Sequence, residues 1–159
     1  MKKDRFLMGM VIGIGVVVVL AVGLFIARQG QVEYLSADTP NSVVHNFILA
    51  LTRSDYERAY TYLAEKPNKP TPNQFRQDLT SSPPGFNQTS LSIGETLVDA
   101  DFATVQLLLS QSYGGPFTER TRYTDTARLE RQAGSWKLVS MPYPFWSFNW
   151  FVEQPKPLP

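Results

Sequence analysis

The sequence predicts a single transmembrane helix followed by an α+β domain, in which three helices pack on a curved four-stranded antiparallel sheet. Three observations lead to this fold class. Residues 6–27 contain no charged side chain, apolar residues recur at helical spacing between residues 40 and 81, and strand-like segments rich in Thr, Val, Leu and Tyr follow Gly85. Helices that precede a run of antiparallel strands are typical of the α+β class.

The apolar segment at residues 6–27 predicts a helix that crosses a membrane. Its length corresponds to about 33 Å at about 1.5 Å per residue, against a hydrocarbon core of about 30 Å. A cleaved signal peptide is the alternative, but its apolar stretch is about 7–15 residues long and ends in a small-x-small site. Here the segment is longer and runs into Arg28 without such a site, so the sequence favours an uncleaved signal-anchor.

The flanking charges predict the orientation of that helix. Lys2, Lys3 and Arg5 precede it, and basic residues favour the cytoplasmic side. Residues 1–5 are therefore predicted to be cytoplasmic, and the C-terminal domain of this single-pass membrane protein to be extracytoplasmic.

Gly9 and Gly13 form a G-x-x-x-G spacing within the apolar segment. Small residues four apart let two helices approach closely, which makes this pair a candidate for transmembrane packing. The alternative is that glycine is simply common in membrane helices.

A connector at residues 28–38 leads to the folded domain, predicted over residues 39–143. Its first helix is expected to begin at Asp38 or Thr39, with Pro40 in the first turn. The pattern Ser-Asp-Tyr-Glu at residues 54–57 predicts a capping box and a second helix. A third helix is expected to follow the cap signal at residues 71–74 and to end at residues 81–85.

Four strands are predicted after Gly85. Their ranges are 87–98, 102–113, 117–132 and 135–143, separated by turn-forming residues. In the third strand Thr118, Arg120, Arg122, Thr124 and Thr126 alternate onto one face, which is expected to be wet.

Composition excludes several classes of function. Residues 29–159 carry 11 basic and 13 acidic side chains, so the domain lacks the positive charge that nucleic-acid binding needs. The chain has no cysteine, which excludes disulfides, thiolate metal sites and a cysteine nucleophile. One histidine is too few for a typical metal site, and no phosphate-binding glycine motif occurs. The sequence predicts no metal, no cofactor and no nucleic-acid partner.

The first two predicted helices and the last strand resemble those of the nuclear transport factor two-like superfamily, in its membrane-anchored bacterial form. In that superfamily a helix ending in Phe-x-x-Ala-Leu and a helix of the Asp-Tyr-x-x-Ala-Tyr kind precede the sheet. The matching residues here are Phe47, Ala50, Leu51, Asp55, Tyr56, Ala59 and Tyr60, with Gly134-Ser135-Trp136-Lys137-Leu138-Val139 as the late strand. The resemblance covers residues 39–143 and implies a cone in which helices and a bent sheet enclose a pocket. Some members use that pocket for catalysis, and fold alone does not fix function.

Catalytic residues are not evident. His45 lies off the apolar stripe of its predicted helix, which favours a surface or flanking position over a catalytic one. Asp99 and Asp101 are typical of a hairpin turn, and a carboxylate pair for acid–base work is the alternative. Asn87 begins a glycosylation sequon, which matters only in a eukaryotic secretory pathway.

The segment at residues 144–159, with Tyr143 before it, is unusually rich in aromatic residues and ends in a proline-rich sequence. Three interpretations are open: the aromatic side chains fill or cover the cone, they form a membrane-interface belt, or they form a docking patch for a partner. The candidate residues are Tyr143, Phe145, Trp146, Phe148, Trp150 and Phe151.

The sequence therefore predicts a membrane-anchored, extracytoplasmic binding or accessory domain without catalytic activity, as a subunit of a larger membrane assembly. Its expected partners are the lipid bilayer and other membrane proteins or further copies of itself. The alternative is a small-molecule binder or an isomerase- or dehydratase-like enzyme that uses the cone pocket. For that function Tyr56, Tyr60 and Asp101 are the candidates.

Overall fold

The structure is a computed structural model that describes residues 3–28, 32–81, 89–112 and 120–152. The chain divides into two compact units, Met1–Glu33 and Tyr34–Pro159. Each unit is described by itself below. The sequon residue Asn87 and the predicted strand ends at 87, 113 and 117 lie outside the described residues.

The first unit contains one helix, α1 (Lys3–Arg28). Its side chains are described for residues 8–23, and all of these are exposed. In the part of the chain that the structure describes, no helix combines the length and the apolar composition that a membrane crossing requires.

This finding corrects the prediction made from residues 6–27. The transmembrane helix in the predicted fold class, the single-pass membrane assignment and the extracytoplasmic placement are wrong. Gly9 and Gly13 are exposed on α1, and helix pairing through these glycines stays a prediction.

The second unit begins with three helices whose N-termini are capped by side chains. Thr39 caps α2 (Pro40–Thr52) and accepts a hydrogen bond from the amide of Ser42. Asp55 caps α3 (Tyr56–Thr61) by accepting from the amide of Arg58, so the cap lies one residue after the predicted Ser54. In α4 (Pro72–Ser81) the side chains of Thr71 and Gln74 form a reciprocal capping box.

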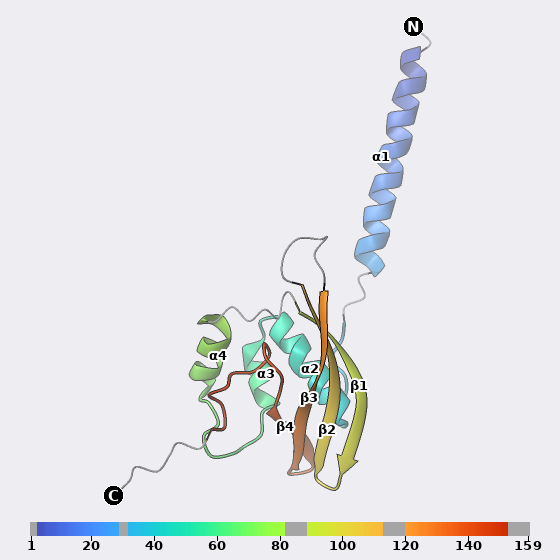
Figure 1. Cartoon of the computed structure of the whole chain (residues 1–159). Coiled ribbons are helices and arrows are strands. Elements are labelled where there is room, and N and C mark those ends of the chain that lie inside the picture. The colour runs from blue at the N-terminus through green and yellow to red at the C-terminus, as the bar shows by residue number, and fades with distance from the viewer. Residues whose placement is uncertain (1–2, 29–31, 82–88, 113–119, 153–159) are drawn as a thin grey trace, which may run out of the picture. The chain divides into compact units, whose positions relative to one another are not determined.

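Four antiparallel strands form one sheet in the order β1-β2-β3-β4. They are β1 (Thr89–Asp99), β2 (Phe102–Ser112), β3 (Arg120–Gln132) and β4 (Ser135–Ser140). The three helices of the second unit lie to one side of this sheet (Figure 1). The described residues are thus α+β, with four helices and a four-stranded antiparallel sheet.

Alternation along the strands separates a packed face from a wet face. Ala103, Val105, Leu107 and Leu109 of β2 are buried, as period-two geometry requires for one face of a strand. On the opposite face of β3 the side chains of Arg120, Arg122 and Thr124 are exposed and Thr126 is half-buried. Thr118, which was expected to share the wet face, lies outside the described residues.

The edge of the sheet at β4 is covered by the chain that follows α3. The amide of Ala64 donates to the carbonyl of Leu138 at 2.8 Å, and the amide of Leu138 donates to the carbonyl of Tyr62 at 2.8 Å. Gln132 extends the contact because its side chain bonds both the amide and the carbonyl of Glu65. These bonds pair one sheet edge and fix α3 against the sheet.

Candidate functional site

The six aromatic residues at the end of the domain divide into a buried and an exposed group. Three of them lie in the hydrophobic core: Phe145, Trp146 and Trp150. Phe151 is half-buried. Tyr143 and Phe148, by contrast, expose 53% and 79% of their surface. The segment thus contributes to the core and to the surface at once.

The buried aromatic side chains continue a line of ring contacts through the helical layer. The ring of Phe75 lies 5.5 Å from that of Tyr60 and 4.8 Å from that of Trp150. Trp146 in turn lies 4.8 Å from Trp150 and 6.1 Å from Phe47 of α2. Each such ring buries about 150–250 Å², so these contacts hold the C-terminal segment firmly against α2 and α4.

Three polar contacts fix the path of the segment. The indole nitrogen of Trp150 donates to a carboxylate oxygen of Asp78 on α4 at 2.7 Å. The amide of Phe151 donates to the carbonyl of Asn68 at 3.2 Å, and the hydroxyl of Tyr123 on β3 donates to the carbonyl of Tyr143 at 3.4 Å. The segment is therefore attached to α4, to the loop before it and to the sheet.

Tyr143 and Phe148 form what we call the aromatic ridge. Their rings are stacked, with centroids 5.9 Å apart and an interplanar angle of 10°. The two residues are exposed. Both of them line two hollows, one toward α4 and one toward the sheet. The ridge is consequently an apolar projection between two concave surfaces.

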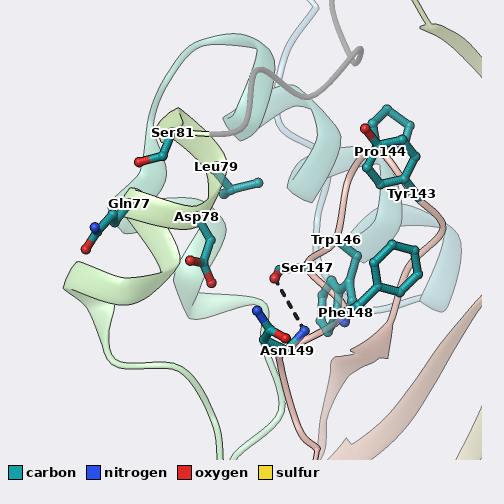
Figure 2. Close-up of a pocket in the computed structure, with 10 residues that line it drawn as sticks. All are labelled: Gln77, Asp78, Leu79, Ser81, Tyr143, Pro144, Trp146, Ser147, Phe148 and Asn149. Carbon is teal, nitrogen blue, oxygen red and sulfur yellow. Dashed lines mark hydrogen bonds between the residues drawn. The ribbon is translucent and has the colours of Figure 1, made fainter.

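The first hollow, the α4 groove, has a volume of about 350 Å³ and separates α4 from the aromatic ridge. Figure 2 shows Asp78 pointing across it toward Ser147 and Asn149, with Phe148 and Tyr143 on the opposite wall. The amide of Asn149 is bonded to the hydroxyl of Ser147 at 3.4 Å. The lining of the α4 groove thus combines aromatic rings, hydrogen-bonding side chains and one carboxylate.

The second hollow, on the sheet side of the ridge, has a volume of about 360 Å³. Its lining includes Tyr123, Asp125 and Arg128 of β3 together with the two ridge residues. Its lining thus combines charged side chains of the sheet with aromatic rings.

The space between α2 and the sheet, where the resemblance implied a ligand pocket, is occupied by apolar side chains. Phe47 and Leu107 have no exposed surface, Leu129 exposes 1%, and Trp146 packs on Phe47. All four residues belong to one hydrophobic cluster.

The residues considered for catalysis do not converge. His45 is half-buried on α2, and its ring nitrogen lies 3.4 Å from the side-chain oxygen of the neighbouring Asn46. Asp99 and Asp101 are exposed at the β1–β2 turn, where Ala100 has a positive φ of 49°. Across the described ranges, no group of three or more His, Cys, Asp or Glu side chains is placed to hold a metal ion.

Tyr56 and Tyr60 lie together, but apart from Asp101. They line a hollow of about 320 Å³ between α3 and α4, and Asp101 is not among its lining residues. The hydroxyl of Tyr60 donates to the carbonyl of Pro70 at 2.9 Å. The hydroxyl of Tyr60 is therefore used in a hydrogen bond that supports the fold. Tyr56, Tyr60 and Asp101 do not lie in one site.

Sequence analysis missed two residues that anchor the start of the second unit. The amide of Asn46 is buried, and its side chain both donates to and accepts from the backbone of Leu35 at 2.7 and 2.8 Å. The guanidinium of Arg58 lies 3.5 Å from the centroid of the Tyr34 ring, and a hydrogen bond with Tyr62 raises the pKa of Arg58. A polar residue within an apolar helical stripe was the available signal for Asn46.

Comparison with known proteins shows similarity of fold to solved structures but does not assign the chain to a family. The sequence is similar to no protein-family model and to no curated protein. The structure is similar to a calcium/calmodulin-dependent protein kinase type II association domain from Thiobacillus denitrificans, with a TM-score of 0.50 and 13% identity over 66% of this chain and 93% of that chain.

Two further structures show a weaker likeness. A SEC-C motif containing protein from Rhodopseudomonas palustris has a TM-score of 0.48 and 14% identity, over 74% of this chain and 84% of that chain. A cystatin fold protein from Novosphingobium aromaticivorans has a TM-score of 0.42 and 8% identity, over 62% and 95%. At such identities the likeness concerns the fold alone. The structural neighbours are proteins of the nuclear transport factor two-like or cystatin-like fold.

Proposed function

We propose that the chain is a non-catalytic binding or accessory domain that docks a partner protein through the aromatic ridge. One observation carries this proposal. The C-terminal segment buries three aromatic side chains, yet it leaves Tyr143 and Phe148 stacked on each other and exposed. Packing in the chain does not explain why these two rings should stand at the surface.

The surroundings of the aromatic ridge suit a protein–protein contact. Aromatic residues dominate the energetics of interfaces when neighbouring contacts exclude water from them. The hollows of about 350 and 360 Å³ on the two sides of the ridge can receive side chains of a partner, whose contacts would complete the exclusion of water. The segment is also held by the Trp150–Asp78 and Tyr123–Tyr143 hydrogen bonds, so little ordering is needed on binding.

The charge near the ridge favours a protein partner over a nucleic acid. Asp78 lines the α4 groove, and Asp125 and Arg128 line the sheet-side hollow. Carboxylates beside the ridge would repel phosphate groups, whereas nucleic-acid sites are lined by basic side chains.

Paired variants of the full chain test this function. We would isolate the tagged wild type, Y143S/F148S and L97S/F102S from native cells and quantify the proteins recovered with each. Leu97 and Phe102 are a matched control because they expose 66% and 64% of their surface at the β1–β2 hairpin, away from the ridge. Truncation of an interface hot spot costs about 2 kcal/mol or more, which is about thirtyfold in affinity.

The expected result is a partner that the wild type and the hairpin control recover equally and that Y143S/F148S recovers at least about tenfold less. The proposal fails if the ridge variant recovers the same proteins in the same amounts as the wild type. It also fails if only the hairpin variant loses its partner.

A further inference from the structure

The α4 groove carries a negative charge that no described residue balances. Among the described residues that line it, Asp78 is the one acid, and none is Lys, Arg or His. The ion pairs within the described ranges join Lys66 to Glu130 and Lys69 to Glu65, so neither includes Asp78. Asp78 is half-buried, and a charge that is partly removed from water interacts more strongly with a counter-charge. The groove therefore favours a cationic occupant.

One oxygen of the Asp78 carboxylate is available to such an occupant. Its Oδ2 accepts the indole N–H of Trp150 at 2.7 Å, and no described residue donates to Oδ1. Figure 2 shows this carboxylate pointing across the groove toward Ser147 and Asn149. A carboxylate can accept several N–H groups at once. The bond to Trp150 thus fixes the direction of the carboxylate without using all of its capacity.

The place of Asp78 in α4 strengthens the preference for a cation. Asp78 stands within the last four residues of α4, and the last turn of this helix contains no basic residue. The carbonyl groups at a helix C-terminus carry partial negative charge, which disfavours an acid there and favours a cation. Leu79 and Ser81 also line the groove, so this end of the helix borders it. Such a conflict with a local rule is expected at functional sites.

The other lining residues suit a guanidinium better than an ammonium group. The exposed rings of Tyr143 and Phe148 form the wall opposite α4, and a planar guanidinium stacks on aromatic rings while it donates N–H groups in a fixed geometry. A lysine ammonium is compact and more strongly hydrated. Ser147 and Asn149 offer side-chain oxygens that can accept further N–H groups. The groove, with a volume of about 350 Å³, thus provides each contact that an arginine side chain makes.

We infer that the α4 groove receives an arginine side chain of the partner, which pairs with Asp78 and stacks on Phe148. This inference rests on the proposed function, because Phe148 also belongs to the aromatic ridge. It specifies the chemistry of the partner, whose contact segment presents an arginine beside the residues that cover the ridge.

Titration with capped amino acids tests the inference without the partner. We would add N-acetyl-arginine amide to the full wild-type chain and follow the indole N–H signal of Trp150, which is bonded to Asp78. N-acetyl-citrulline amide is the matched probe, because its side chain has a similar shape and no charge. The expected result is a saturable shift of the Trp150 signal with arginine and at least about tenfold weaker binding of citrulline. The signal of Trp136, which does not line the groove, should not move.

An isosteric variant tests the role of Asp78. Asp78→Asn retains an oxygen that can accept from Trp150 but removes the negative charge, so it should bind the arginine probe at least about tenfold more weakly. Asp99→Asn is the matched control, because it removes one exposed carboxylate at the β1–β2 turn and should bind the probe as the wild type does. Denaturant unfolding of both variants checks that the fold is retained.

Several results would overturn the inference. These are a Trp150 signal that does not move at the highest soluble concentration of the arginine probe, equal binding of citrulline, and a folded Asp78→Asn variant that binds arginine like the wild type. N-acetyl-lysine amide should bind more weakly than the arginine probe, and equal binding of the two would overturn the assignment to arginine.

The outcome is separable from that of the proposed function. If the Trp150 signal does not respond while Y143S/F148S still loses its partner, only the arginine is excluded. If the signal responds through Asp78 while the ridge variant keeps every partner, the docking function fails and the groove is a site for a guanidinium group alone. If both hold, Asp78→Asn should recover about tenfold less partner than the wild type, and Asp99→Asn the same amount.

Discussion

Asn46 shows at the scale of one residue how a polar side chain can define where a domain begins. It exposes 1% of its surface among apolar neighbours on α2, and a buried amide without partners is costly. Both of its hydrogen-bonding functions are satisfied by the backbone of Leu35. The residue therefore fastens the segment before α2 to the helix.

We expect Asn46→Ala to lower the free energy of unfolding by about 1–3 kcal/mol, because the backbone groups of Leu35 lose their partner. Asn73→Ala on the exposed face of α4 is the matched control and should change stability by less than about 0.5 kcal/mol. Denaturant titration followed by tryptophan fluorescence measures both. Equal stability of the two variants would show that the Leu35 contact contributes nothing.

His45 and Asn46 differ in how well the sequence predicted their surroundings. Helical spacing correctly placed His45 off the most buried stripe. The same spacing places Asn46 beside apolar neighbours but does not identify its partner, which lies 11 residues away in a segment without regular structure. Side-chain partners outside an element are not encoded in the periodicity of that element.

At the scale of the element, local signals predicted the helices and strands of the second unit well. Turn-forming residues and caps act within a few residues, and α2 and α4 begin where their caps predict. The exception is α3, where Ser54 has a φ of 57° and the cap passes to Asp55. The bridge between Leu63 and Leu138 was not predicted, because pairing across such a separation leaves no local pattern.

We expect Thr71→Ala to destabilise α4 by about 0.5–2 kcal/mol, since it removes the oxygen that accepts from the amide of Gln74. Hydrogen exchange of the first α4 amides should become faster, and Thr71→Ser should retain most of the protection. Unchanged exchange in Thr71→Ala would mean that the packing of Phe75, rather than the cap, determines where α4 starts.

At the scale of the whole molecule, composition led to a wrong prediction for the N-terminal segment and to an incomplete one for the C-terminal segment. The uncharged residues 6–27 predicted a membrane crossing that the described helices do not support. The aromatic density at the C-terminus was visible, but the division into buried and exposed rings was not. That division depends on Phe47 and Phe75, which reach the segment from distant parts of the chain.

The division of the aromatic side chains predicts opposite effects on stability. Trp146→Ala should lower the free energy of unfolding by about 3–5 kcal/mol, because it leaves a cavity in the core. Y143S/F148S should change it by less than about 1 kcal/mol, because both rings are already exposed. Thermal and denaturant unfolding of the three proteins measures the difference. A large loss in the ridge variant would identify the ridge as a structural element instead of a binding surface.

The central claim is that the aromatic ridge contacts a partner protein, and site-specific photo-crosslinking in native cells tests it most directly. A photoreactive phenylalanine would replace Phe148 in one strain and Phe102 in another. We predict a discrete crosslinked product of higher mass from position 148, its loss when Tyr143→Ser is added, and no such product from position 102. Position 148 giving no product, or the same product as position 102, would contradict the claim.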